Sequence, residues 1–422
     1  MVKSATFKGR ILVLAGILLV AATLRSAVTV VPPVVSEISN TLPIDSLTIG
    51  LLGMLPTLAF AVFGFLTPFV LRWASLEKLT ILAMAVAVFG QVARVFAPNT
   101  PLFLVFTVVG LAGLGAGNVL LPPLVKHYFP DRVGLVTALY VTMLSLGTAI
   151  PAQSAVPVAD GFGWQTSLVV WAGANLVAAL PWVLTLLGRS GPPRSDQITG
   201  PQPPAHAGVP PAGAAQGSSA RQESAAPQKI SVWRSPMAIG LTVMFGCTSL
   251  NTYAMFAWLP VILSEAGLSR ADAGSMLALF AILGLPLSLL VPLLASRMRN
   301  QFPIVAVLLV AFVVGYLGLW LSPAQLTWLW VVLAGIGPGT FPLALLLINL
   351  RTRGREAAGA LSGFTQGVGY AIACIGPVLF GLLHQGTGNW TAGFGFLFAT
   401  LALLGVGAFF ACRPAYLEDQ QA

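Results

Sequence analysis

The sequence predicts an all-α integral membrane protein with twelve transmembrane helices in two pseudo-symmetric six-helix halves. Three observations lead to this fold class: the composition, a regular succession of apolar runs, and a repeat between the two halves. Of the 422 residues, 57% are hydrophobic and only 8% are charged, and the mean hydropathy is +0.89. A soluble domain carries about 25% charged residues because its surface faces water. The low charge content therefore predicts a surface that faces lipid.

Apolar runs follow one another along most of the chain. A membrane helix needs about 20 mainly apolar residues. Twelve such runs are predicted, at approximately 11–36, 46–71, 79–97, 102–125, 133–156, 164–187, 236–264, 272–296, 302–321, 325–349, 356–383 and 391–412. The first run follows Lys3, Lys8 and Arg10, as the apolar part of a signal peptide would. It continues past Arg25 to about Ser36 without a convincing cleavage site, so we interpret it as the first span.

The composition changes between the sixth and seventh runs. Residues 188–235 are rich in Pro, Gly, Ala, Ser and Gln, and such a segment cannot bury a core. We therefore expect three parts: an N-terminal six-helix bundle at 1–187, a cytoplasmic disordered linker at 188–235, and a C-terminal six-helix bundle at 236–422.

Basic residues gather on one side of the predicted membrane. If both termini are cytoplasmic, the cytoplasmic side carries Lys3, Lys8, Arg10, Arg72, Lys78, Lys126, Arg132, Arg189, Arg194, Arg221, Lys229, Arg234, Arg297, Arg299, Arg351, Arg353, Arg355 and Arg413. The other side has Arg94 and Arg270, together with the carboxylates Glu37, Asp45, Asp160, Glu265 and Asp272. Cytoplasmic loops collect Lys and Arg. The bias predicts that both termini are cytoplasmic, and it excludes a nucleic-acid surface. We expect a multi-pass protein of the cell inner (plasma) membrane.

A sequence repeat relates the two halves. The segment from Leu111 to Gly117 matches the segment from Leu333 to Gly339, an offset of 222 residues. Parallel repeats with a substrate site between the halves are typical of one large class of transporters. The pairs Gly113/Gly117 and Gly335/Gly339 have the spacing that lets helices approach closely, and we favour this role over solute contact. The prolines at 32–33 and 122–123, and Pro338 with Pro342, predict bends or breaks in their helices.

Several short motifs are distributed over nearly all twelve spans: Leu24-Arg25 before Pro32-Pro33, Arg94 with Pro98, Lys126 to Phe129, Ala257 to Pro260, Gly339 through Leu347, Gln366 to Tyr370, and Gly376-Pro377. At these residues the sequence resembles the cyanate permease and 2-nitroimidazole transporter family of the major facilitator superfamily. The superfamily's signature after the second span is reduced here to Gly64 and Arg72, which puts its usual gating loop in doubt. The resemblance implies a major facilitator fold and transport of a small anion or a compact heteroaromatic compound.

Arg25 is a charged residue inside the first apolar run. It lies fifteen residues beyond Arg10, about 22 Å along a helix, and therefore near the middle of a hydrocarbon core about 30 Å thick. No Asp or Glu lies well inside any predicted span. Backbone carbonyls of a broken helix could hold the guanidinium. We favour the alternative, that a solute anion supplies the partner, because the fixed guanidinium donors bind planar anions bidentately.

Other polar and aromatic residues are candidates for the same pocket. Arg94, near the outer end of its span, could snorkel outward, or it could attract or gate the solute. Pockets have mostly apolar walls with a few placed polar groups, although each polar side chain could instead bond a neighbouring helix. The predicted substrate-binding residues are Arg25, Asn118, Tyr253, Trp258, Gln366 and Tyr370.

The sequence thus predicts an alternating-access secondary transporter of a small solute, with cyanate or a related compact anion held by Arg25 as the favoured substrate. The alternatives are an exporter of a nitroimidazole-like heteroaromatic, and a non-transporting receptor or channel. The sequence carries no phosphate-binding loop and no evident catalytic or metal-ligand set. We therefore expect no enzyme activity, no cofactor and no metal. We also expect a monomer whose partners are its solute and the bilayer, with no nucleic acid.

Overall fold

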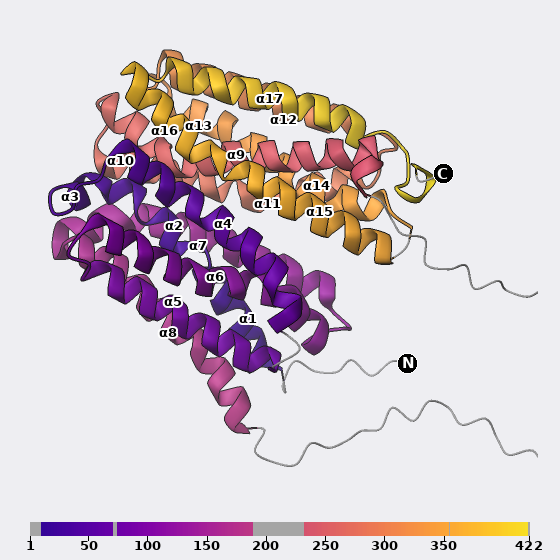
Figure 1. Ribbon diagram of the computed structural model, residues 1–422, viewed down its shortest axis with the longest axis horizontal. Helices are drawn as coiled ribbons and strands as arrows, with labels where there is room; N and C mark the ends of the chain where they lie inside the picture. Colours follow the sequence, from indigo (N-terminus) through magenta and orange to yellow (C-terminus); the bar gives the residue numbers. More distant parts are fainter. Residues whose placement is uncertain (1–9, 71–73, 189–231, 354, 421–422) are drawn as a thin grey trace, which may run out of the picture.

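The computed structural model describes residues 10–70, 74–188, 232–353 and 355–420 (Figure 1). Within these ranges the regular elements are all helices. The first half contains α1 (Ile11–Thr23), α2 (Ser26–Thr29), η2 (Pro32–Val34), α3 (Val35–Ser39), α4 (Ser46–Val70), α5 (Leu76–Val95), α6 (Thr100–Tyr128), α7 (Val133–Phe162) and α8 (Trp164–Gly188). The second half contains η3 (Val232–Arg234), α9 (Pro236–Glu265), α10 (Arg270–Ile282), α11 (Gly284–Ala295), α12 (Phe302–Leu321), α13 (Thr327–Ile336), η4 (Gly337–Gly339), α14 (Thr340–Leu350), α15 (Arg355–Ala373), α16 (Ile375–Thr387), α17 (Thr391–Ala411) and η5 (Glu418–Gln420).

The predicted all-α fold with twelve spans is confirmed. In the described part of the chain, 11 helical segments are long and apolar enough to cross a membrane. The remaining predicted span is α9, which is long enough but includes Thr, Ser and Asn side chains and is buried along most of its length. It can carry these polar groups because it packs against α17, α15, α16, α10 and α4 rather than lipid. The core of the predicted linker, residues 189–231, lies outside the described residues.

Several spans are broken rather than continuous. The first span is interrupted between α1 and α2 at Leu24 and Arg25, and again by the 3₁₀ turn at Pro32–Val34. The tenth span is broken by the 3₁₀ turn Gly337–Gly339, where Pro338 stands, as predicted. By contrast, Pro122 and Pro123 lie inside α6, which continues to Tyr128. The break at Arg25 interrupts the helix beside the charged side chain.

Close approach of helix backbones explains why Gly113 in the fourth span and Gly147 in the fifth span are glycines. A Cβ placed on Gly113 would lie 2.3 Å from the Ala83 carbonyl oxygen. A Cβ on Gly147 would lie 2.0 Å from the Ala22 carbonyl oxygen. Both distances are far below van der Waals contact, so only glycine fits. The interpretation of Gly113 as a helix-packing residue is confirmed.

The two halves lie side by side, and both termini lie at the same end of the molecule (Figure 1). We call this the terminal end, and the opposite end, where α3 and the start of α10 lie, the far end. Among the described residues, the polar contacts between the halves lie at the middle and the far end: Arg25–Tyr253, Thr57–Cys374, Gln153–Ser275, Arg270–Glu37 and Arg270–Asp160. The halves are therefore joined at the far end.

Candidate functional site

A cavity of about 340 Å³ lies between the halves, bounded by α4 and α6 on one side and α15 on the other. Its polar lining comes from Asn118, Ser362, Gln366 and Tyr370, and its apolar wall includes Phe60. Three of the predicted candidates, Asn118, Gln366 and Tyr370, thus line one cavity. They come from opposite halves of the chain, so motion of one half against the other would change the cavity.

Arg25 does not itself line this cavity but lies against Phe60 of the cavity wall, between aromatic rings. The guanidinium carbon is 5.8 Å from the Phe60 ring centre and 5.8 Å from the Tyr253 ring centre. Both distances allow a cation–π interaction. Nη1 donates to the Tyr253 hydroxyl at 3.0 Å. The break between α1 and α2 positions Arg25, since Arg25 is the residue before α2 and its backbone leaves the helix there.

The remaining donors of Arg25 have no protein acceptor in the described part of the chain. Arg25 forms no ion pair there, and its nitrogens are not among the buried atoms that lack a partner. The side chain is half-buried. The predicted alternative, a closed set of backbone carbonyls around the guanidinium, is not what the structure shows. Instead, donors of the half-buried Arg25 remain without a protein acceptor next to Phe60 of the cavity wall.

The neutral polar side chains of the cavity differ in how many of their hydrogen-bonding atoms already have a protein partner. Gln366 Nε2 donates to Ser362 Oγ at 2.8 Å, which leaves the Gln366 carbonyl oxygen as an acceptor. Asn118 is half-buried and makes no hydrogen bond within the described residues. The Tyr370 ring packs 6.1 Å from Phe60 and 5.1 Å from Phe245, measured between ring centres. The site therefore offers amide and phenol groups and one guanidinium, with aromatic walls.

Trp258 has a different environment from the other candidates. It is 1% exposed, does not line the cavity, and donates its indole N–H to the Pro377 carbonyl at 2.8 Å. Its ring packs against Phe380 and Trp390. These contacts give Trp258 a structural role near the far end.

Arg94 does not snorkel outward. Its side chain is 1% exposed and turns inward, and Nη1 donates to the Ala27 carbonyl at 3.4 Å. The snorkelling alternative is therefore wrong. Sequence position gives the depth of a residue in its span, but the direction of the side chain depends on how the helix is rotated in the bundle.

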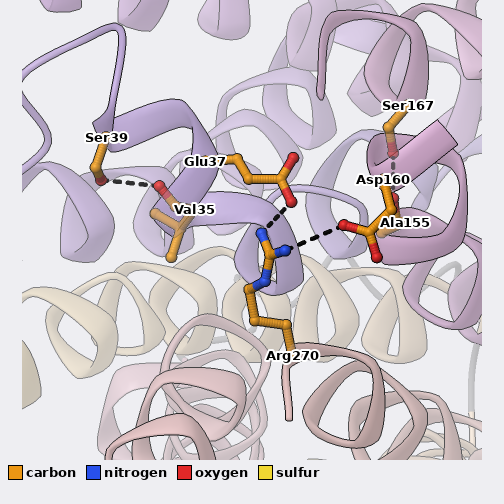
Figure 2. Close-up of polar contacts among 7 residues, drawn as sticks. All are labelled: Val35, Glu37, Ser39, Ala155, Asp160, Ser167 and Arg270. Carbon is orange, nitrogen blue, oxygen red and sulfur yellow. Dashed lines mark hydrogen bonds and ion pairs between the residues drawn. The ribbon is translucent and has the colours of Figure 1, made fainter. Parts of the chain in front are cut away.

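An ion-pair cluster at the far end joins the two halves, and the sequence did not predict it. Figure 2 shows Arg270, the first residue of α10, between Glu37 of α3 and Asp160 of α7. Arg270 Nη1 bonds Glu37, and Nη2 lies 3.0 Å from Asp160 Oδ1. The sequence did contain an indication of this cluster, because Arg270 is a basic residue among the acidic residues on that side of the predicted membrane. We call these three residues the far-end clamp.

The chain matches known membrane transporters over most of its length. The model of the Major Facilitator Superfamily matches residues 14–377. The chain is 32% identical over 410 residues to the uncharacterized transporter YycB of Bacillus subtilis (strain 168), covering 96% of this chain and 94% of that one. It is 34% identical over 410 residues to the 2-nitroimidazole transporter of Escherichia coli (strain K12), covering 96% and 97%. It is 26% identical over 379 residues to the cyanate transport protein CynX of the same strain, covering 89% and 90%.

The fold also matches solved structures. A bacterial homologue of the human lysosomal transporter Spinster, in an inward-facing and occupied conformation, superposes with a TM-score of 0.71, 15% identity and 99% coverage of both chains. At that identity the likeness concerns the fold alone. The matching family consists of transporters, so the chain is a secondary transporter and not an enzyme, receptor or channel. It belongs to the major facilitator superfamily, in the family that contains the 2-nitroimidazole transporter and the cyanate transport protein of E. coli.

Proposed function

We propose that this transporter moves a small anion, such as cyanate or a related compact anion, and that Arg25 holds the negative charge. The observation that carries the proposal is the half-buried Arg25 guanidinium beside the cavity, without a carboxylate partner in the described residues. An arginine at mid-membrane depth costs roughly 2.5–3.5 kcal/mol and normally faces a cavity or a partner. An anion in the cavity would offset that cost.

The cavity favours a compact solute. Pockets for small molecules span about 300–1,000 Å³, and this one, at about 340 Å³, is near the lower limit. The guanidinium would bind the anion, while Asn118 and Tyr370 would donate to a second acceptor atom on it. Tyr253 would hold Arg25 in place.

Transport would follow from the arrangement of the two halves. We take the terminal end to be cytoplasmic, because it carries the basic residues, and the protein to lie in a bacterial inner membrane. The structure is then an inward-facing state, closed at the far end by the far-end clamp. Opening that end and closing the terminal end would expose Arg25 to the other side. The cavity is formed by a single chain, so we expect the monomer to be the working unit, without nucleic acid as a partner.

A second substrate class has support from the aromatic walls. Phe60 and Tyr253 flank the charged group, and Tyr370 packs against Phe60; flat rings stack on such residues. A nitroimidazole-like heteroaromatic could place its nitro group on Arg25 and its ring between these side chains. The relative named as a 2-nitroimidazole transporter is also the more similar of the two E. coli relatives.

The two classes are separated by transport into proteoliposomes that contain the purified protein. Uptake of labelled cyanate is compared with uptake of 2-nitroimidazole. Arg25→Ala is expected to abolish cyanate uptake, and Arg25→Lys to transport poorly because it lacks the planar pair of donors. Wild-type uptake of cyanate by Arg25→Ala would refute the anion site. Transport of 2-nitroimidazole without cyanate would favour the second class.

A further inference from the structure

Two buried polar side chains lie three residues apart on α5, and one of them, Arg94, bonds the broken first span. Gln91 and Arg94 are each 1% exposed, and residues three apart lie on the same face of a helix. Arg94 Nη1 makes one long bond, 3.4 Å, to the Ala27 carbonyl of α2. Arg94 Nε and Nη2 and both amide atoms of Gln91 have no partner among the described residues. Four polar atoms on two neighbouring side chains are therefore buried and unsatisfied.

A purely structural role does not account for these groups. The bond to Ala27 supports α2 but uses one donor of Arg94, and it leaves Gln91 unexplained. Buried polar groups are nearly always bonded, because leaving them unpaired costs free energy. Arg351 is a useful contrast, since this buried arginine bonds the Ala411 and Cys412 carbonyls and Gln301. Other described side chains, such as Ser249, leave a single buried polar atom unpaired, whereas Gln91 and Arg94 leave two each. This concentration of unmatched groups points to a partner that the protein itself does not supply.

A second, smaller space lies between the halves; neither Gln91 nor Arg94 lines it, and Arg94 approaches it through the Ala27 carbonyl that it bonds. A cavity of about 20 Å³ is lined by Ala27, which accepts the Arg94 bond, and by Thr107 of α6. Phe256 and Ala257 of α9 close it from the second half. A volume of this size holds about one water molecule, so a solute does not fit in this conformation. Because its walls come from both halves, parting the halves at the far end would enlarge it.

We infer that Gln91 and Arg94 form an outer anion subsite, which binds the solute on its way from the far end to Arg25. The ligand is a small monoanion with at least two acceptor atoms, since the two unpartnered Arg94 nitrogens and the Gln91 amide nitrogen are donors. The inference rests on the proposed function, because it assumes the same anionic solute. It adds a second positive centre, used in the outward-facing state, and a residue, Gln91, that sequence analysis did not select.

The subsite predicts a directional defect in transport. Cyanate uptake is measured in proteoliposomes of both orientations, so that KM is obtained separately from the far side and from the terminal side. A bond to a charged group contributes about 1.5–3 kcal/mol, so Arg94→Met should raise the far-side KM about 10- to 100-fold. The terminal-side KM should change less than about twofold, because Arg25 is reached first from that side. Gln91→Leu removes no charge and should raise the far-side KM by a smaller factor.

Ser249→Ala is the matched control, since Ser249 is also buried with an unpartnered oxygen; it should leave both KM values unchanged. A mutation that only biased the conformational equilibrium would shift the two KM values in opposite directions. Opposite shifts of the two KM values would overturn the subsite. So would an equal rise of both KM values, or an unchanged far-side KM in both Arg94→Met and Gln91→Leu. If Arg25→Ala still abolishes uptake in that case, the proposed function stands. Failure of the wild type to transport cyanate would overturn both.

Discussion

The Arg25 guanidinium donates to the Tyr253 hydroxyl at 3.0 Å, and this bond crosses from the first half of the molecule to the second. Tyr253 is 3% exposed on α9, so the hydroxyl is fixed by the packing of that helix. A solute bound to Arg25 would therefore sit next to a contact that must change when the halves move. Under the proposed function, solute binding and the relative position of the halves would be linked through this side chain.

Tyr253→Phe tests this link. The substitution keeps the ring that faces Arg25 and removes only the hydroxyl, so Arg25 loses its one protein acceptor in the described structure. We expect a less ordered guanidinium and a KM for cyanate uptake raised about 3- to 10-fold, from the loss of about 1 kcal/mol of positioning. Tyr316→Phe is the control, because the Tyr316 hydroxyl bonds the Asn251 carbonyl inside the second half. Equal KM values in wild type and Tyr253→Phe would contradict the link.

The features that could be predicted from the sequence are those that depend on the number of apolar runs and on the position of a residue along its run. Eleven of the spans are long and apolar enough to be recognised from hydropathy, and α9 is the exception. The absence of an acidic partner for Arg25 followed from the lack of Asp or Glu well inside the spans, and it needed no coordinates. Gly113 was assigned to helix packing from its spacing to Gly117, and its predicted role agrees with the 2.3 Å approach to the Ala83 carbonyl.

The features that could not be predicted depend on how each helix is rotated about its axis, since that rotation decides which neighbour each side chain contacts. Trp258 and Tyr253 lie on the same helix and were equal candidates, yet Trp258 donates to Pro377 while Tyr253 bonds Arg25. Arg94 was placed at the correct depth, but its inward direction is set by the packing of α5. Arg270 bonds Glu37, 233 positions away in the sequence. Such pairs also depend on the conformational state, because they join halves that move.

A disulfide between the halves should lock the transporter. The Thr57 hydroxyl oxygen lies 3.2 Å from the Cys374 sulfur, and the two residues belong to different halves. In Thr57→Cys the new sulfur takes nearly the position of that oxygen, close to a thiol that the chain already has. Mild oxidation should abolish uptake, and reduction should restore it. The same variant with Cys374→Ser should stay active under oxidant. Retained activity in a fully oxidised Thr57→Cys sample would show that the halves move without separating here.

Gly113→Ala should destabilise the fold. The added methyl group would lie 2.3 Å from the Ala83 carbonyl oxygen and 2.5 Å from the Ala87 nitrogen. Both are backbone atoms, so α5 and α6 must separate, which costs roughly 1–3 kcal/mol. Thermal unfolding of the protein in detergent should show a lower Tm. Gly359→Ala serves as the control, because nothing lies within 4 Å of its Cβ position. An unchanged Tm for Gly113→Ala would mean that this contact is not tight.

Arg270→Gln should open the far end. The substitution removes both ion pairs of the far-end clamp, to Glu37 and Asp160 (Figure 2). These groups are partly exposed, so each pair contributes at most about 1 kcal/mol. Losing both should raise the outward-facing population about 3- to 10-fold.

The measurement is the rate at which a membrane-impermeant maleimide, added from the far side, labels Cys374 between the halves. Cys247 and Cys412 are buried within the second half and should not react. Arg353→Gln is the matched control, because it breaks an exposed pair with Asp419 inside one half. The clamp would have no part in gating if Arg270→Gln and Arg353→Gln labelled at the wild-type rate. A higher rate in Arg270→Gln alone is expected, since only that variant weakens a contact that must break when the far end opens.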